Sequence, residues 1–384
     1  MQTQSLIYLA VVFGLLVVPR ALQRFRLPAQ LTCFAFGIIV AGFYKALISD
    51  VVISYLSTLG IASLFLLAGL EVDLTELRRQ ASSLIAHFAI RGLVLVAFAY
   101  ITGVFLHLGW QVDCMIALAL LTPSTGFILD MLPHSGLNHT EQSEVALHAV
   151  TGEITAVFLF LVLSQASSVK TLLISGGAIF LLIALMPFVY IALARFVVPY
   201  APGSEFSLLL MVGLICAVIT KDLGVYYLVG AFVAGLVARF LSKRLKTLAS
   251  AENLEAIRLF ASFFIPFYFF HSGLGVPTAA LVTASLTYGF VLAAIVVPVR
   301  LGVIWLQSRL MRRRGTRGSF RVAIALSPTL IFTLVIAEIL RDNFAISPPL
   351  YGGLLVYAAV ASILPALTLP AFAETSEIPL PIEA

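Results

Sequence analysis

The sequence is a succession of apolar stretches, each about 20 residues long, which is the length of a helix that crosses the hydrocarbon core of a bilayer. Hydrophobic residues make up 61% of the 384 residues and charged residues only 11%, whereas a soluble domain carries about 25% charged residues. This composition excludes a cytosolic enzyme, a disordered protein and a nucleic-acid-binding domain. The chain is therefore predicted to be an all-α polytopic protein of the lipid bilayer, with no nucleic acid among its partners.

The charged residues and the proline and glycine breaks delimit thirteen candidate membrane spans. They are centred on Ser5–Val18, Pro28–Phe43, Val51–Leu70, Ser82–Leu106, Cys114–Met131, Val145–Ser164, Leu172–Val198, Phe206–Thr220, Val225–Phe240, Leu254–Leu274, Leu281–Leu306, Val322–Leu340 and Leu350–Pro370. The first stretch has no basic residue before it and no small-residue cleavage site after it, which predicts a retained helix rather than a signal peptide. The three cysteines lie at unpaired spacings, so we expect no disulfide framework, no metal site built from them and no cofactor.

The basic residues predict the orientation of the chain. With the N-terminus outside, sixteen Lys and Arg residues fall on the inside, and only Lys45, Lys170, Lys221 and Arg341 fall on the outside. Loops on the cytoplasmic side carry such an excess. We therefore expect a multi-pass protein of the plasma (cell inner) membrane with a cytoplasmic C-terminal tail over 371–384. The basic run Arg309–Arg321 is expected to contact anionic lipid headgroups.

Four sequence similarities in the same order predict an internal repeat of six helices. Repeat one covers about 5–164, a linker helix covers about 172–198, and repeat two covers about 206–370. The matching segments are Val40-Ala41-Gly42 with Val233-Ala234-Gly235, Ala68–Val72 with Ser272–Val276, Arg91–Val94 with Arg300–Val303, and Leu121–Ser124 with Leu326–Thr329. A shift by seven helices reverses the orientation, and inverted repeats of this kind are typical of secondary transporters.

Two prolines at repeat-related positions lie deep inside apolar stretches. Pro123 is flanked by Thr122, Ser124 and Thr125, and Pro328 follows Ser327. Proline removes a backbone donor and leaves a carbonyl that needs another partner in lipid. A single proline would favour a simple kink. The pair favours two crossed discontinuous helices whose ends supply carbonyl oxygens and dipoles to a bound ion.

Two ionisable residues in apolar surroundings are the main functional candidates, because charges at bilayer depth are costly. Glu153 can bind a monovalent cation or a proton, and the alternative is a protonated glutamate that only bridges helices. Arg300 does not deprotonate and needs a counter-charge. Either Glu153 or the C-terminal end of a broken half-helix can supply it. Snorkelling of Arg300 to the inner face is the alternative, and its separation from Arg309 argues against that.

Other ionisable residues carry weaker arguments. Arg91 has the repeat-related place of Arg300, and a structural role is an equal alternative. For the rest we expect an ion pair between Glu338 and Arg341, a vestibule or solvated position for Asp130, a helix-bridging role for His271 and no role for His148.

Three motifs resemble the monovalent cation:proton antiporter family, in its second, largely bacterial branch. Leu64–Leu74 resembles that family's signature at the end of its third helix. Arg26-Leu27-Pro28 followed by Gly37 to Gly42 resembles the start of its second helix, and Leu223-Gly224-Val225 followed by Gly230–Gly235 resembles its helix eight–nine region. The resemblance covers nearly the whole chain. It implies thirteen helices, a homodimer, a scaffold, and a moving core formed by about 82–164 and 281–370.

The resemblance also implies roles for particular residues. Gly152-Glu153 stands where the family usually has Asp-Asp, Asn-Asp or Gln-Asp, whose second acid binds the ion. Arg300 matches a basic residue of the eleventh helix, often Lys. Thr122, Pro123, Ser124 and Thr125 match a Thr/Ser-rich break in the fifth helix, where proline is unusual. This set predicts ion and proton binding by Glu153, Thr122, Ser124 and Thr125, charge compensation by Arg300, and breaks at Pro123, Ser327 and Pro328.

The function implied is exchange of Na⁺ or K⁺ for H⁺ by alternating access, performed by a transporter and not by an enzyme. Two alternatives stay open. A sodium-coupled organic-anion symporter can share crossed broken helices, but it needs a polar substrate cavity. A non-transporting sensor or assembly partner that keeps the fold is supported only by the changed pair Gly152-Glu153.

Overall fold

The computed structural model describes residues 2–25, 27–72, 81–132, 135–164, 169–222, 227–241, 250–312 and 316–369. These residues form helices and their connections and include no strand, so the predicted all-helical fold is confirmed. The helices are α1 (Gln2–Gln23), α2 (Ala29–Phe43), η1 (Lys45–Ser49), α3 (Val51–Glu71), α5 (Ala81–Leu106), α6 (Trp110–Leu121), α7 (Thr125–Met131), α8 (His139–Ser164), α9 (Val169–Phe196), α10 (Glu205–Asp222), α11 (Tyr227–Leu241), α12 (Ala251–Leu274), η3 (Thr278–Ala280), α13 (Thr283–Arg312), α14 (Thr316–Ala325), α15 (Leu330–Phe344) and α16 (Pro348–Thr368). Outside the described residues lie Arg26, Asp73, Leu74, Leu223-Gly224-Val225, the side chain of Asp130 and the tail over 371–384.

Each predicted stretch coincides with one helix or with one broken pair of helices. Among the described residues, eight segments are long and apolar enough to cross a bilayer, or nine if the bent pair α14–α15 forms one span. One of the eight, Trp110–Leu129, runs through both α6 and α7. The apolar segments Ala29–Phe43 in α2 and Val229–Leu241 in α11 are shorter. A total of thirteen spans therefore stays a prediction.

One group of helices is held together by glycines at close crossings. Within it, α3 packs against α11 and α12, and α2 packs against α12. A Cβ atom added at Gly69 would lie 2.2 Å from the carbonyl oxygen of Phe232 on α11, and one at Gly273 would lie 2.1 Å from that of Phe34 on α2. The backbones approach so closely because neither position carries a side chain.

These crossings form two equivalent pairs under the predicted repeat. A shift of seven helices relates α2 to α11 and α3 to α12, so it converts the α2–α12 contact into the α11–α3 contact. Both contacts bring glycines together, Gly37 with Gly273 in the first and Gly69 with Gly235 in the second. The match supports the inverted repeat, which stays a prediction.

A methyl group at Gly37 is expected to destabilise the protein, whereas one at Gly42 on the same helix is not. The Cβ of an alanine at position 37 would lie 2.1 Å from the carbonyl oxygen of Phe270, but at position 42 it would meet nothing within 4 Å. The collision involves backbone, so α2 and α12 must separate and lose packing. Thermal unfolding in detergent should give a melting temperature several degrees lower for Gly37→Ala than for Gly42→Ala. Equal melting temperatures would contradict the close crossing.

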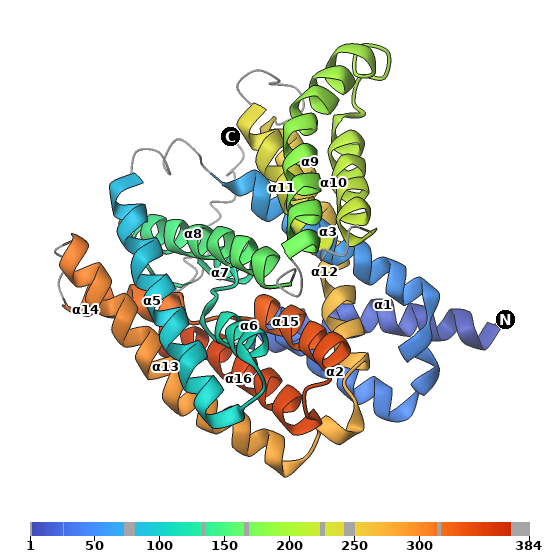
Figure 1. Cartoon of the computed structure of the whole chain (residues 1–384). Helices are drawn as coiled ribbons and strands as arrows, with labels where there is room; N and C mark the ends of the chain where they lie inside the picture. The colour runs from blue at the N-terminus through green and yellow to red at the C-terminus, as the bar shows by residue number, and fades with distance from the viewer. Residues whose placement is uncertain are drawn as a thin grey trace, which may run out of the picture.

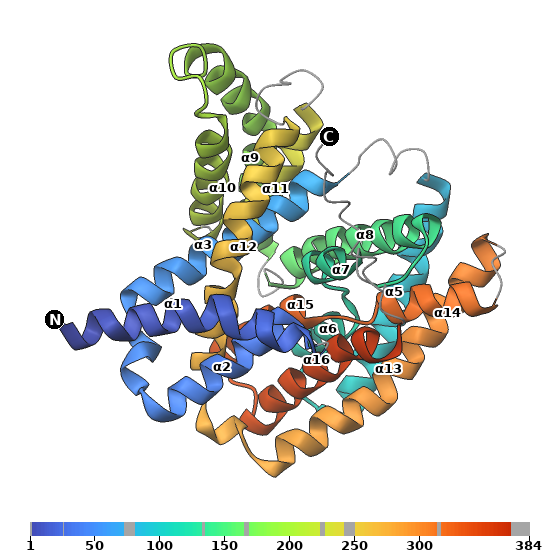
Figure 2. The same cartoon turned by 180° about the vertical axis from the view of Figure 1, so that it is seen from behind.

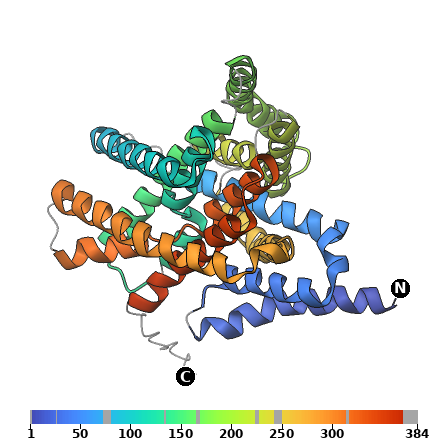
Figure 3. The same cartoon turned by 60° about the horizontal axis from the view of Figure 1, so that its bottom comes forward.

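The second group of helices lies beside the first. In it, α13 packs against α16 and α14, α15 packs against α16 and α6, and α5 packs against α6. In Figures 1 and 2, α9, α10 and α11 (green to yellow-green) extend away from α5, α13 and α16. Figure 3 shows α1 and α2 (blue) side by side, on the opposite side of the molecule from α5 (cyan). Between the groups, α3 contacts the short half-helix α7.

Candidate functional site

Two helices of the second group are interrupted at the predicted prolines. The first break separates α6, which ends at Leu121, from α7, which begins at Thr125. The second separates α14 from α15 over residues 326–329, and the two halves are bent by 43°. Pro123 and Pro328 lie inside these breaks, where a residue without an N–H cannot continue the helical hydrogen bonds.

The two breaks are hydrogen-bonded to each other. The N–H of Ser124 donates to the carbonyl oxygen of Pro328 at 2.9 Å. In the other direction, the N–H of Ile331 donates to the Oγ of Ser124 at 2.9 Å. Ser124 therefore joins both breaks, and its hydroxyl accepts a bond from the first turn of α15. This satisfies one of the backbone N–H groups that every helix N-terminus leaves without an intrahelical partner.

Glu153 lies at the N-terminal end of the half-helix α7. It is carried by α8 and is only 4% exposed. Its Oε2 accepts a hydrogen bond of 3.0 Å from the N–H of Thr125, the first residue of α7. Free N–H groups and the helix dipole make such an end positive, so it favours a carboxylate. The structure thus brings the predicted acid directly to one of the two breaks.

Two threonine hydroxyls at the breaks are buried and have no hydrogen-bond partner among the described residues. They are the Oγ1 atoms of Thr125 and Thr329. A buried hydroxyl in a native protein is normally satisfied, by water or by a ligand where protein groups do not reach. Thr122 differs, since its Oγ1 donates to the carbonyl oxygen of Leu118 at 2.6 Å. Thr125 and Thr329 therefore differ from Thr122, because their hydroxyls have no protein partner among the described residues.

Thr329 was not among the predicted site residues. A signal for it exists in the sequence, because the repeat alignment sets Ser327-Pro328-Thr329 against Thr122-Pro123-Ser124. Thr329 is thus the counterpart of Ser124. It also begins α15 as the N-cap residue, with no capping bond from its side chain.

Arg300 is held by the C-terminal end of α14. Its Nη1 donates to the carbonyl oxygen of Ser327 at 2.8 Å and its Nη2 donates to that of Leu326 at 3.1 Å. These carbonyls follow the last turn of the half-helix, which carries the negative end of its dipole. Of the two possible partners for Arg300, the structure gives the half-helix end. No hydrogen bond or ion pair joins Arg300 to Glu153 among the described residues.

Tyr357 links Arg300 to the other broken helix. Its hydroxyl accepts a hydrogen bond of 3.1 Å from Arg300 and donates one of 2.6 Å to the carbonyl oxygen of Leu120 near the end of α6. Sequence reasoning missed Tyr357, which lies on α16 in an apolar stretch with no polar motif around it. A tyrosine there looks like any core aromatic until α16 is packed against α6 and α13.

Arg91 occupies the space beside Gly152. Its Nη2 donates to the carbonyl oxygen of His148 at 2.9 Å. A Cβ atom added at Gly152 would lie 1.8 Å from the Nη1 of Arg91 and 2.8 Å from the ring of Pro123. The missing side chain at position 152 is therefore what admits the guanidinium. His148, to which no role was assigned, contributes its backbone carbonyl.

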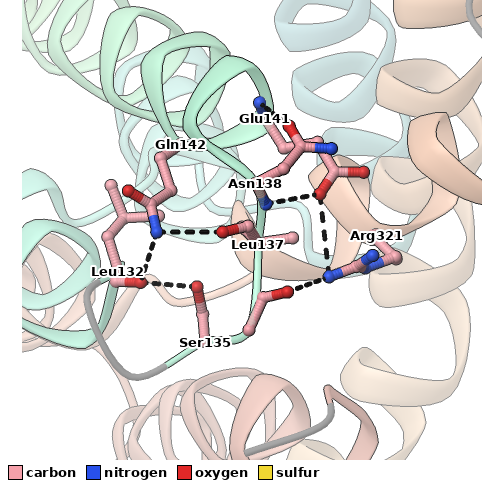
Figure 4. A network of polar contacts seen from close by, with 8 residues as sticks. Leu132, Ser135, Leu137, Asn138, Glu141, Gln142 and Arg321 are labelled. Atoms are coloured by element: carbon pink, nitrogen blue, oxygen red, sulfur yellow. Dashed lines mark hydrogen bonds and ion pairs between the residues drawn. The ribbon is translucent and has the colours of Figure 1, made fainter. Parts of the chain in front are cut away.

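A polar network at the start of α8 contains one arginine of the predicted basic run. Arg321 lies on α14 and donates to the carbonyl oxygen of Gly136, and its Nη2 lies 3.6 Å from the Oε2 of the buried Glu141 (Figure 4). Asn138 and Glu141 cap the helix reciprocally, with bonds of 3.0 and 2.9 Å. Arg321 is thus tied to the start of α8, and the expected contact of the run Arg309–Arg321 with lipid headgroups stays a prediction.

The ion pair expected between Glu338 and Arg341 is not the one that forms. Arg341 makes its ion pair with the adjacent Asp342, at 2.7 Å, and not with Glu338. It also donates to the hydroxyl of Tyr351 at 3.3 Å and to the carbonyl oxygen of Gly275 at 2.9 Å, which directs its side chain toward α16 and the end of α12. Those contacts draw the guanidinium away from the preceding helical turn.

The sequence matches the family of transmembrane sodium/hydrogen exchangers over residues 8–375. The chain belongs to this family. This confirms the resemblance to monovalent cation:proton antiporters, and it makes the chain a multi-pass integral membrane protein. Members of the family are transporters and not enzymes.

Individual relatives agree with this assignment. The chain is 23% identical to a probable Na⁺/H⁺ antiporter 3 of Methanocaldococcus jannaschii over 287 residues, which are 71% of this chain and 72% of the relative. Its fold is similar to a structure of the sodium proton antiporter MjNhaP1 from the same organism at pH 8, with a TM-score of 0.68, 16% identity and 96% of both chains covered. An electron-microscopy structure of MjNhaP1 gives a TM-score of 0.62 at 15% identity, over 96% of this chain and 95% of that one.

Proposed function

We propose that the protein exchanges a monovalent cation, Na⁺ or K⁺, for H⁺ by alternating access, and that Glu153 holds either the cation or the proton. The observation that carries this proposal is the hydrogen bond between the buried carboxylate of Glu153 and the N–H of Thr125. It holds an acid in an apolar interior, at the junction of two broken helices. Ionisable residues in such places mark ion and proton pathways.

The groups around Glu153 suit an alkali cation. The carboxylate and the hydroxyls of Thr125 and Thr329 offer oxygen ligands, and these two hydroxyls have no partner among the described residues. Carbonyl and hydroxyl oxygens replace the hydration shell of such ions in membrane proteins. The hydroxyl of Ser124 is oriented by Ile331, and Thr122 bonds within its own helix. We therefore assign direct ligation to Glu153, Thr125 and Thr329, and a shaping role to Thr122 and Ser124.

Competition for one carboxylate couples the two fluxes. Glu153 binds the cation when ionised and is neutral when protonated, so the site carries one or the other and never both. A ligand shifts a conformational equilibrium only as far as it favours one of the two states. In both loaded states, with cation or with proton, the charge of Glu153 is compensated, and we propose that the core moves across the membrane only in these states. With Gly152 in place of a second acid, we propose one-for-one, electroneutral exchange.

The two groups of helices supply the moving parts in this proposal. The core would consist of α5–α8 and α13–α16, and α1–α3 with α9–α12 would form the scaffold of a homodimer. The N-terminus would lie outside and the C-terminal tail in the cytoplasm. Family membership gives no support to the organic-anion symporter or to a non-transporting sensor.

Proton flux in liposomes tests the proposal. Liposomes that contain the protein and an internal pH dye should lose internal protons when Na⁺ or K⁺ is added outside. They should not do so when choline is added. The same measurement with Li⁺ extends the comparison of the rates that different cations give. A potential imposed with valinomycin, in the Na⁺ arm, should leave the rate unchanged. Folded protein that gives no flux with any cation would reject exchange, and strong dependence on potential would reject one-for-one stoichiometry.

A further inference from the structure

A small cavity that contains two arginines lies between α5, α6, α8 and α13. Its volume is about 70 Å³. Arg91 and Arg300 line it, with Gly152 and Pro123 beside them. The remaining described lining residues are apolar except for Thr122, Thr155 and Gln307. Glu153 is not among them, since it faces Thr125 and the start of α7.

The cavity carries an uncompensated positive charge. Arginine is a cation in proteins, and the cavity is lined by two of them. Within the described part of the chain, no Asp or Glu lines the cavity, and neither arginine belongs to an ion pair. Arg300 is partly neutralised by the carbonyls at the end of α14. Arg91 donates to one carbonyl, that of His148, and its Nη1 lies against Gly152.

The position of the two arginines along their helices favours a bound ion over a lipid headgroup as the counter-charge. Arg91 is ten residues from the start of α5, and Arg300 is twelve residues from the end of α13. At 1.5 Å per residue these are distances of about 15 and 18 Å. Both arginines therefore lie well inside helices that are long enough to cross a hydrocarbon core about 30 Å thick. A buried charge without a partner is costly, so two such arginines on one cavity favour a counter-ion bound between them.

We propose that this cavity binds one small inorganic anion with the charge and size of chloride. A volume of about 70 Å³ admits such an ion but is too small for a drug-sized organic anion, since organic-ligand pockets start at about 300 Å³. The proposed ligands are N–H groups of Arg91 and Arg300, which both line the cavity. Each guanidinium has five N–H donors. Arg91 makes one hydrogen bond to a protein oxygen and Arg300 makes three, so both side chains keep donors for the anion.

This anion site does not depend on cation/proton exchange. It lies on another side of α8 from the carboxylate of Glu153, because adjacent residues on a helix point about 100° apart. Arg91 and Arg300 come from α5 and α13, so a shared anion would also hold these two helices together. Binding therefore stabilises the fold and is measurable without transport.

The test is the thermal unfolding of the purified full-length protein as gluconate is replaced stepwise by chloride, at fixed Na⁺ and pH. We expect a saturable rise of several degrees in the melting temperature, because the anion binds the folded state only. Arg91→Gln should abolish the rise, and Glu153→Gln should keep it. Arg309→Gln is the matched control, since this exposed arginine on α13 lies over the ring of Trp305 and outside the cavity.

Bromide provides a second readout. Crystals grown with bromide should give an anomalous peak between Arg91 and Arg300. Equal melting temperatures in chloride and gluconate would overturn the proposal, and so would the absence of a bromide peak. If Arg91→Gln does not fold, the chloride titration of the wild-type protein and the bromide peak test the anion site without it. A failure of liposome exchange with an intact chloride effect would count against the proposed transport alone.

Discussion

Replacing Glu153 by Gln should reduce cation-driven proton flux to the level of empty liposomes. Glutamine keeps an oxygen that can accept the 3.0 Å hydrogen bond from the N–H of Thr125, so the half-helix α7 stays capped. It cannot ionise, however, and therefore offers neither the charge that holds a cation nor a site that takes up a proton at neutral pH. The measurement is the response of an internal pH dye to added Na⁺ or K⁺.

Two further variants make this result specific. Glu153→Asp keeps the ionisable group but shortens its reach by one methylene, so we expect slower exchange with weaker apparent cation affinity. Glu252→Gln is the control, because this exposed residue lies on the first turn of α12, away from the breaks. Flux through folded Glu153→Gln protein at the wild-type rate would show that another group carries the ion.

Replacing Arg300 by Gln should lower stability strongly and change the pH dependence of the surviving exchange. The substitution removes the donors to Ser327, Leu326 and Tyr357. Each hydrogen bond from a charged group contributes about 1.5–3 kcal/mol, and the carbonyls at the end of α14 would be left buried. We expect a clearly lower melting temperature, with partial recovery in Arg300→Lys, whose ammonium can still donate to a carbonyl.

The pH profile separates charge compensation from bracing. Loss of a fixed positive charge near the site favours the protonated form of a carboxyl group. If Arg300 compensates Glu153, the optimum for exchange moves to higher pH in Arg300→Gln. An unchanged profile from about pH 6 to 9, together with lower stability, would leave Arg300 only as a brace for the end of α14.

Several features of the site could be predicted from local sequence. Proline at positions 123 and 328 interrupts a helix because of its own covalent structure, and the breaks occur there. Glu153 could be selected because a carboxylate in an apolar stretch is costly to bury, and ionisable residues in such places mark ion and proton pathways. The repeat alignment also points to Thr329, although only the buried, unpartnered hydroxyl brings it to attention.

Other features depended on which helices pack together. Glu141 lies before the predicted span Val145–Ser164, and the structure buries it beside Arg321. Tyr357 is 237 residues away in sequence from Leu120, whose carbonyl oxygen accepts a hydrogen bond from the tyrosine hydroxyl. No local pattern encodes such contacts, because they form only when distant helices meet.

The sequence by itself determined the membrane-spanning helical class, the two breaks and the choice of Glu153 as the candidate acid. Each of these follows from a property of individual residues or of short segments, namely apolar length, the missing proline N–H and the cost of a buried charge. The tertiary structure decided the partners. In the folded protein, Glu153 accepts a hydrogen bond from the N–H of Thr125, and Arg300 donates to carbonyls at the end of α14. The guanidinium of Arg91 packs against Gly152. Partners of charged groups are set by the few ångströms over which hydrogen bonds act, and only the packed helices fix those distances.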